Sequence, residues 1–245
     1  MPQPEIVIVG PGRLGRTVAA ALEDVGWHVQ LCGRGQAVVP CPITWLTVPD
    51  AAIERVAAQV PRGGVLLHAS GATDLSALHP HELVGSLHPL MTFPGPEIAV
   101  PLMANLPAAI AGGHQAQQAA RQIAAALGWR PFTVHGDRAL YHAAAVIAGN
   151  YATTLLAIAA EVLTAAGVDA DEAPSLLAPL AITSLLNAAG TDPTLALTGP
   201  VARGDTDVIA RHRQSLAEVP GSAAAVYAVM LQATQGLLQA KKDQD

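Results

Sequence analysis

The chain has 245 residues, a formal net charge of −6 and 51% hydrophobic residues. This length can bury a sizeable core, either as one large domain or as two modest ones. The 13 Lys and Arg residues form no cluster, so we expect no nucleic-acid partner. Because only 13% of the residues are charged, we expect part of the helical surface to be covered in a homodimer interface.

The first ten residues, MPQPEIVIVG, place no basic segment before their apolar run, which argues against a secretory signal and favours a cytoplasmic location. Cys32 and Cys41 lack the spacing and the neighbouring ligands that a zinc site needs, and they indicate no disulfide framework. We therefore expect two buried thiols and no metal.

An uncharged stretch from residue 142 to residue 160 is long enough to cross a bilayer. However, Asn150, Tyr151 and two threonines interrupt it, and neither a basic loop nor an aromatic belt flanks it. A second uncharged run, residues 174–191, contains Pro179. We expect two helices that bury each other and no membrane contact.

The N-terminal residues predict a strand at 6–9, a tight glycine turn, a helix at about 14–25 and a second strand at 28–32. The turn has GxGxxG spacing, in which the glycines permit the turn, the close approach of a pyrophosphate and helix packing. The helix N-terminus would face the phosphates. The predicted dinucleotide-binding residues of this turn are Gly10, Pro11, Gly12, Arg13, Leu14 and Gly15.

The end of the second strand, LCGRG, distinguishes NADP from NAD, because an acidic residue there would bind the ribose hydroxyls of NAD. No acidic residue is present. Arg34 follows the strand, Arg13 lies in the glycine turn, and a guanidinium group suits a phosphate. We predict NADP as the cofactor; the alternative is that Arg34 is a solvated loop residue and that NAD binds.

Further strand-like runs at residues 43–48, 64–70, 83–89 and 106–112, with helical spacers between some of them, predict a doubly wound Rossmann-type parallel sheet of the α/β class. Ligands lie outside the carboxyl ends of such strands. Thr47, Val48 and Pro49 should therefore lie along the cofactor, with Ser70 and Gly71 beyond them at the substrate. Asp50 is interpreted as the N-cap of the next helix.

A hydride reaction on a carbonyl or imine needs a proton donor near the heteroatom, and histidine titrates close to neutral pH. His88, in GSLHPLMTF, is the first candidate for this role. The alternative is that His88 only hydrogen-bonds the backbone of a proline turn. His68 is interpreted as a satisfied strand residue.

Strand signals end near residue 137, which predicts a dinucleotide-binding domain at 1–136 and an all-helical domain at 137–245 for substrate binding and dimerisation. In an ideal helix His142 and Asn150 share a broad face, whereas Tyr141 points elsewhere. We predict that both contact the substrate; the alternative is a helix–helix hydrogen bond. Arg203, in ALTGPVARGD, could hold a substrate carboxylate or pair with a neighbouring aspartate.

The chain resembles a bacterial family of oxidoreductases in which a Rossmann-like NAD(P)-binding domain precedes a helical domain of unknown function. The resemblance rests on GPGRLG, TVPD, HASG, GSLHPLMTF, YHAAAVIAGNYATT and ALTGPVARGD, in this order over essentially the whole chain. That family is similar to the group that holds 6-phosphogluconate, β-hydroxyacid and prephenate dehydrogenases, ketopantoate reductase and pyrroline-5-carboxylate reductase. In that group the helical domain completes the site and usually dimerises.

The resemblance implies that His88 matches the His-Pro loop of prephenate dehydrogenases, whose histidine contacts the substrate hydroxyl, and that Ser70 and Gly71 contact substrate. The chain departs from β-hydroxyacid dehydrogenases and ketopantoate reductase, which place a catalytic lysine on the first long helix, because it has no Lys before residue 241. His142 or Asn150 could replace this lysine, or His88 could act alone.

These observations predict an NADP-dependent oxidoreductase that transfers a hydride between the nicotinamide and a small carbonyl, imine or hydroxy acid. The rival hypothesis is a regulator or scaffold protein that binds NADP(H) without turning it over. An enzyme that binds FAD is a third reading.

Overall fold

The computed structural model describes residues 5–93 and 104–243. The chain forms two compact units, Met1–Gly149 and Asn150–Asp245, and each is described by itself. The division falls 13 residues after the sequence-based boundary at 136/137, because the helix that follows this boundary packs on the first unit.

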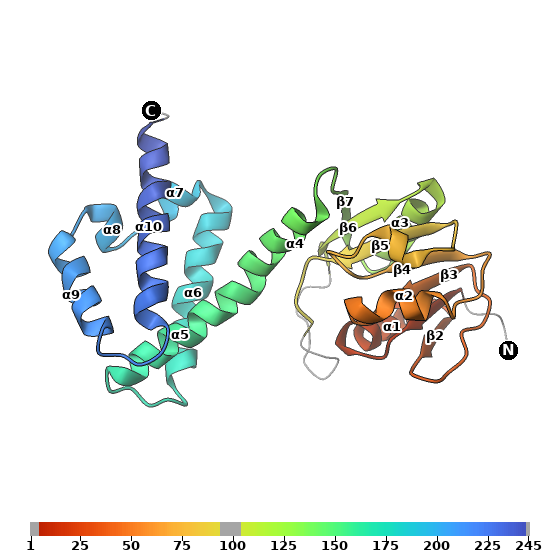
Figure 1. The fold of residues 1–245 in the computed structure, drawn as a ribbon, viewed down its shortest axis with the longest axis horizontal. Coiled ribbons are helices and arrows are strands. Elements are labelled where there is room, and N and C mark those ends of the chain that lie inside the picture. Colours follow the sequence, from red (N-terminus) through yellow and green to blue (C-terminus); the bar gives the residue numbers. More distant parts are fainter. Residues whose placement is uncertain (1–4, 94–103, 244–245) are drawn as a thin grey trace. The chain divides into compact units, whose positions relative to one another are not determined.

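The first unit is built on a seven-stranded sheet with the order β2-β1-β3-β4-β5-β6-β7 (Figure 1). All neighbours pair in parallel except β5 and β6, so the expected Rossmann-type sheet is present with two reversed strands at one edge. The strands are β1 (Ile6–Val9), β2 (Val29–Cys32), β3 (Ile43–Leu46), β4 (Val65–His68), β5 (Val84–Pro89), β6 (Pro107–Gly112) and β7 (Arg130–Thr133).

Helices cover both faces of this sheet. The helices α1 (Arg13–Asp24) and α3 (His114–Ala126) pack on one face with a core that includes Trp45. The short helices η1 (Asp50–Ala52), α2 (Ile53–Ala57) and η2 (Leu75–Leu78) lie toward the other face, where Ile53 and Leu78 are buried. Coverage on both faces explains why the central strands read as continuous apolar runs rather than as alternating ones.

The helix α4 (Arg138–Val146) leaves the sheet after β7 and belongs largely to the first unit. Asp137 is its N-cap residue, and the carboxylate of Asp137 accepts a 2.7 Å hydrogen bond from the backbone N–H of Ala139. The ring of Tyr141 contacts that of Phe132 on β7, with ring centroids 6.1 Å apart. A π-helical turn, η3 (Ile147–Tyr151), then separates α4 from α5.

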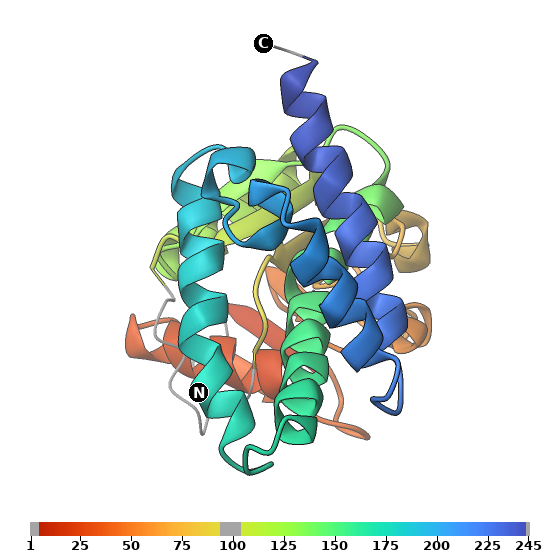
Figure 2. The same ribbon diagram turned by 90° about the vertical axis from the view of Figure 1, so that its left-hand side faces the viewer.

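The second unit is helical, as expected, and it faces the viewer in Figure 2. Its helices are α5 (Ala152–Ala165), α6 (Ala173–Gly190), α7 (Pro193–Ala196), α8 (Pro200–Arg203), α9 (Thr206–Leu216) and α10 (Ala223–Lys242). The sequence did not predict α7 and α8, because one-turn helices between Gly and Pro residues have no measurable hydrophobic period.

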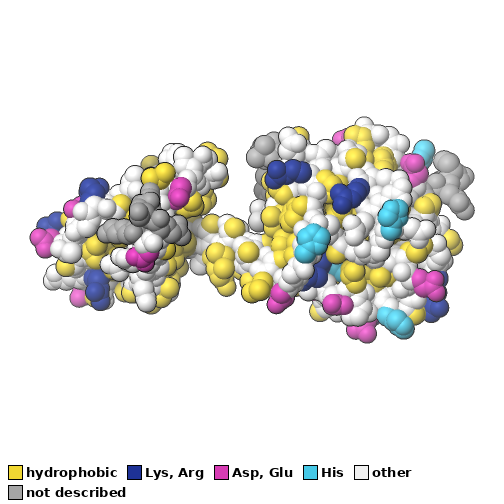
Figure 3. All heavy atoms as spheres, turned by 90° about the horizontal axis from the view of Figure 1, so that it is seen from above, with side chains coloured by type: hydrophobic (Ala, Val, Ile, Leu, Met, Phe, Trp, Pro, Cys, Tyr) yellow, Lys and Arg dark blue, Asp and Glu magenta, His cyan; other side chains and the backbone are white. Residues whose placement is uncertain are grey.

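Two stretches of the described chain, Arg138–Ala165 and Ala173–Gly190, are long and apolar enough to cross a membrane, with mean hydropathies of 1.6 and 1.3. The expectation that they bury each other is met only in part. The helices α5 and α6 do contact, but only 6% of each apolar window is buried within this chain. Hydrophobic side chains accordingly reach the molecular surface (Figure 3).

Candidate active site

The glycine turn joins β1 to α1 and is fixed by contacts to Thr47. Gly10 has a φ of +117°, and a Cβ at this position would lie 2.8 Å from the backbone oxygen of Thr47. A Cβ at Gly15 would collide with the backbone oxygen of Gly10. The Thr47 hydroxyl donates a 2.8 Å hydrogen bond to that same oxygen. Both glycines are therefore required by packing inside the protein.

Gly12 differs from its two neighbours. It is the N-cap residue of α1, and a Cβ placed there would meet no atom within 4 Å. Nothing inside the protein requires glycine at this position, whereas a pyrophosphate at the helix N-terminus would need the backbone to be bare. This open approach is the feature that a dinucleotide-binding turn needs.

A cavity of about 550 Å³ opens at the carboxyl ends of β1, β2 and β3. Arg34 lines it from the loop after β2, and Arg55 lines it from α2; none of the lining residues is acidic. Sequence reasoning missed Arg55, because an exposed arginine on a helix has no local signal of a ligand. The predicted cofactor residues that line the cavity are Gly10, Pro11, Gly12, Arg34, Thr47, Val48 and Pro49, whereas Arg13, Leu14 and Gly15 do not.

Ser70 organises the loop that follows β4. Its hydroxyl donates to the Asp50 carboxylate at 2.8 Å and accepts from the backbone N–H groups of Ala72 and Thr73 at 3.1 and 2.9 Å. Its backbone oxygen accepts a 3.0 Å hydrogen bond from the guanidinium of Arg138. The predicted substrate residue thus has its hydroxyl engaged within the protein, where it shapes the loop.

The interpretation of Asp50 as a helix cap was wrong. Pro49 is the N-cap residue of η1, and the Asp50 side chain makes no capping hydrogen bond. The carboxylate instead holds the Ser70 hydroxyl. The sequence could not show this, because the partner lies 20 residues away on the next loop of the sheet.

His68 lies beneath this loop and is fully buried. Its Nδ1 accepts a 3.2 Å hydrogen bond from the backbone N–H of Ser70, which places its proton on Nε2. This Nε2 is buried and has no partner within the described residues, so the expected satisfied histidine is satisfied on one side only. Burial, together with the nearby charge of Arg138, lowers the pKa of His68 to about 4.

His88 is the penultimate residue of β5 and contacts α4. Its Nδ1 lies 2.6 Å from the hydroxyl of Tyr141, and the two rings meet edge to face with centroids 5.6 Å apart. The prediction that Tyr141 points elsewhere was therefore wrong. The sequence placed this residue by helical angle alone, and the docking of α4 on β5 and β7 decides where the ring lies.

Both members of this pair are uncharged at neutral pH. Burial lowers the pKa of His88 to about 4, and repulsion from His142 and Arg138 acts in the same direction. Burial raises the pKa of Tyr141 to about 12, although the Arg138 charge opposes this rise. At pH 7 the site therefore presents a neutral imidazole bonded to a neutral phenol.

Gly71 brings this pair close to a second histidine. A Cβ at Gly71 would lie 2.9 Å from Cε1 of His88 and 2.9 Å from Cδ2 of His142. The rings of His88 and His142 are 6.3 Å apart. Four predicted residues, His88, His142, Ser70 and Gly71, thus gather at the carboxyl ends of β4 and β5.

The sequence of residues 106–234, more than half of the chain, matches the family described as Domain of unknown function (DUF2520). The chain belongs to this family. The match covers α4 and most of the helical unit, in agreement with the resemblance inferred from the motifs. No curated protein sequence matches the chain.

Solved structures share the fold of this DUF2520 protein. A Thermotoga maritima protein has a TM-score of 0.75 and 22% identity, with 97% of this chain and 99% of that chain covered. A Bacteroides fragilis protein named as a "putative NADP oxidoreductase" has a TM-score of 0.77 and 21% identity, with coverages of 96% and 98%. An Aspergillus terreus reductive aminase, solved with NADPH and ethyl levulinate, has a TM-score of 0.64 and 17% identity, with coverages of 99% and 95%.

Two further site predictions fall in the helical unit of this DUF2520 protein. Asn150 lies in the π-helical turn and is exposed, and the turn breaks the α-helical phase that was used to align it with His142. Its contact with substrate stays a prediction. Arg203 forms an exposed ion pair with Asp205 at 2.8 Å, which is the alternative considered for it.

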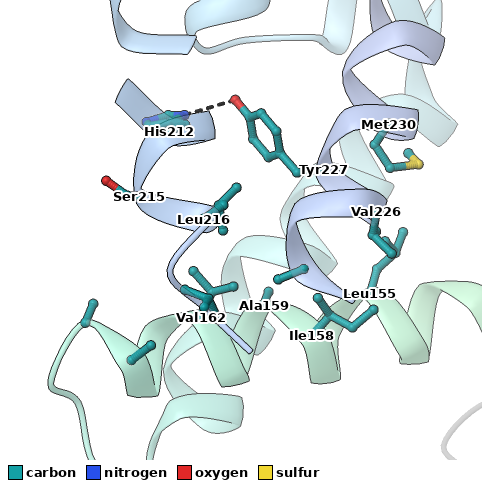
Figure 4. A pocket seen from close by; sticks show the side chains of 14 residues that line it. Leu155, Ile158, Ala159, Val162, His212, Ser215, Leu216, Val226, Tyr227 and Met230 are labelled. Carbon is teal, nitrogen blue, oxygen red and sulfur yellow. Dashed lines mark hydrogen bonds between the residues drawn. The ribbon is translucent and has the colours of Figure 1, made fainter. Parts of the chain in front are cut away.

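The helical unit also holds an apolar cavity of about 560 Å³ between α5, α9 and α10. Figure 4 shows Leu155, Ile158 and Val162 of α5 along one side. At another side, Nδ1 of His212 lies 3.0 Å from the hydroxyl of Tyr227. The rest of its lining is mostly aliphatic, and no Lys or Arg lines it to hold a phosphate.

The glycine turn makes a matched pair of substitutions informative. Gly12→Ala should leave the free energy of unfolding within about 1 kcal/mol of wild type, because the new methyl meets no protein atom. Gly15→Ala should lower it by about 2 kcal/mol or more, since the methyl collides with backbone. Urea unfolding followed by circular dichroism measures both. Equal losses in the two variants would contradict the assignment of Gly12 to a ligand.

Proposed function

We propose that this protein is an NADP-dependent oxidoreductase that transfers a hydride between the nicotinamide and a small carbonyl, imine or hydroxy acid. The observation that carries the proposal is the bare approach at Gly12 beside a cavity with two arginines and no acid. It is supported by the fold shared with the Bacteroides fragilis protein and with the reductase solved with NADPH.

The cofactor would lie along the carboxyl edge of the sheet. Its pyrophosphate would contact the N-terminus of α1 at Gly12, and its adenosine half would fill the cavity. Arg34 and Arg55 would hold the 2′-phosphate, because two guanidinium groups and no carboxylate suit a dianion. When bound, the dinucleotide supplies or accepts the hydride.

The protein would supply orientation and a proton at the other end of the same edge. The sheet has the strand order β1-β3-β4-β5 in this region. His88 and Gly71, at the ends of β5 and β4, therefore lie further along this edge of the sheet than the cavity. His88 would exchange a proton with the substrate heteroatom, and His142 would contact the substrate beside it.

Calorimetric titration with NADPH, NADH and FAD tests the cofactor assignment. Wild type should bind NADPH in preference to the other two. Arg34→Ala should weaken NADPH binding about 10- to 100-fold, because a hydrogen bond to a charged group contributes about 1.5–3 kcal/mol, and should affect NADH far less. Arg121→Ala, on the surface of α3 away from the cavity, is the matched control.

Three outcomes of this titration have different meanings. The absence of dinucleotide binding would overturn the proposal. Preferential binding of FAD would mean that FAD, and not NADP, is the cofactor. Tight NADPH binding, without oxidation of NADPH by any of a panel of keto acids, ketones, aldehydes and imines, would favour a regulator or scaffold protein that binds NADP(H) over an enzyme.

We also propose that the enzyme is a cytoplasmic homodimer that associates through its helical unit. The helix α6 has no charged residue between 173 and 190, and five of its large apolar side chains are more than half exposed in the single chain. Monomeric proteins rarely expose apolar surface on this scale. A second copy of the chain would cover this apolar surface, which is unfavourable in the aqueous cytoplasm. The five exposed side chains are Leu176, Leu180, Ile182, Leu185 and Leu186.

Size-exclusion chromatography with light scattering tests the dimer. Wild type should have twice the mass of the chain, and Leu180→Lys combined with Leu186→Lys should yield monomer, because two charges would be buried unpaired. Val25→Lys changes an apolar residue of similar exposure in the first unit and should leave the mass unchanged. A monomeric wild type, or a double variant that stays dimeric, would contradict the proposal.

A further inference from the structure

The hydrogen bond between His88 and Tyr141 has a preferred direction. Of the two groups, a phenol is the better donor and an imidazole nitrogen the better acceptor. The hydroxyl of Tyr141 therefore donates to Nδ1 of His88 across 2.6 Å. Because the neutral ring carries one proton, this direction places that proton on Nε2.

The ring of Tyr141 is held from two sides. It contacts His88 on β5 edge to face at 5.6 Å and Phe132 on β7 at 6.1 Å. These contacts keep the hydroxyl aimed at Nδ1, so the tautomer of His88 is set by the docking of α4 on two strands. Sequence proximity could not have produced this pairing, since 53 residues separate the two side chains.

The other nitrogen of His88, Nε2, lies beside the loop after β4 that contains Ser70 and Gly71. Nε2 would lie 3.1 Å from a Cβ at Gly71, and no hydrogen bond joins it to any residue in the described part of the chain. A side chain at position 71 would crowd this N–H. The free end of the pair is therefore a hydrogen-bond donor that opens toward the place proposed for the substrate.

We propose that Tyr141 is a positioning residue that fixes His88 as its Nε2–H tautomer and supplies the proton behind it, so that the site acts on a carbonyl/alcohol couple. This inference rests on the proposed function and narrows its substrate class. An iminium ion already carries its proton and needs none when hydride adds, whereas a carbonyl oxygen gains one.

In the direction of reduction, hydride from a reduced nicotinamide dinucleotide forms the new C–H bond, and the C=O π pair becomes a lone pair on oxygen. That oxygen takes the proton of His88 Nε2, while Nδ1 takes the proton of the Tyr141 hydroxyl. Tyr141 is left as phenolate, and the site is restored when Nε2 takes a proton from water and Nδ1 returns its proton to the phenolate. The transfer is favourable because an alkoxide is a stronger base than a phenolate.

Other charged and titratable groups face His88 and bear on its protonation. His142 and Arg138 of α4 both disfavour the imidazolium ion, and Asp50 of η1 favours it. The charge of His88 in turn lowers the pKa of His68 on β4. At pH 7 a neutral imidazole alone is a very weak acid, so the phenol behind it matters most where His88 is uncharged.

Long-range ¹H–¹⁵N correlation spectra of protein labelled with ¹⁵N-histidine test the tautomer without any substrate. Wild type should show His88 protonated on Nε2 and bare on Nδ1. Tyr141→Phe, which keeps the ring and removes the hydroxyl, should shift this population toward a mixture of both tautomers. An Nδ1–H tautomer in wild type, or an unchanged spectrum in the variant, would overturn the inference.

The matched control is Tyr227→Phe, which removes the hydroxyl of a similar edge-to-face tyrosine–histidine pair in the helical unit. It should leave the His88 signals unchanged. NADPH titrations of both variants should match wild type. If wild type does not bind NADPH, the proposed function is contradicted. The NMR spectra would still decide the tautomer of His88.

The rate with the fastest carbonyl of a panel of keto acids, aldehydes and ketones supplies the second readout. At pH 8, Tyr141→Phe should lower kcat about 100-fold or more, with little change in KM. The gap should narrow as the pH falls from 8 to 5, because imidazolium forms increasingly as the pH approaches about 4 and donates without help. His88→Ala should gain no such rescue. A loss independent of pH, or faster turnover of 1-pyrroline than of every carbonyl, would contradict the inference.

Discussion

The parallel alignment of β1, β3, β4 and β5 is the constraint on which the site depends. It brings the ends of four strands to one edge of the sheet, so that residues far apart in sequence meet there. The glycine turn follows β1, Thr47 follows β3, the Ser70 loop follows β4, and His88 lies near the end of β5. Hydrogen bonds between these loops, such as those of Thr47 to Gly10 and Ser70 to Asp50, then fix them relative to one another.

At the β4–β5 end of this edge, titratable side chains are buried without carboxylates that would pair with all of them. His68 and His88 are both held neutral, and Arg138 is the cation whose field reaches them. A neutral histidine can orient a substrate and move a proton only if its tautomer is fixed and a proton lies within reach. The proposed role of the contact with Tyr141 is to provide both.

Features that depend on local chemistry could be read from the sequence, and features that depend on docking could not. The glycine turn and the Asp137 cap were predictable because each involves residues within a few positions of one another. The role of Asp50 and the direction of Tyr141 were predicted wrongly, since the partner of Asp50 is on another loop and the direction of Tyr141 depends on how α4 meets β5 and β7. Arg55 gave no signal at all. The π-helical turn that contains Asn150 was not predicted either, because the sequence presents one continuous helix there.

The central claim is that one dinucleotide extends from the glycine turn to His88 along this edge. A crystal structure of the protein grown with NADPH tests it most directly. The account predicts the pyrophosphate at Gly12, the 2′-phosphate between Arg34 and Arg55, and the nicotinamide beside Gly71 with C4 open toward His88. NADPH bound elsewhere, or bound with its nicotinamide turned away from β4 and β5, would contradict the account.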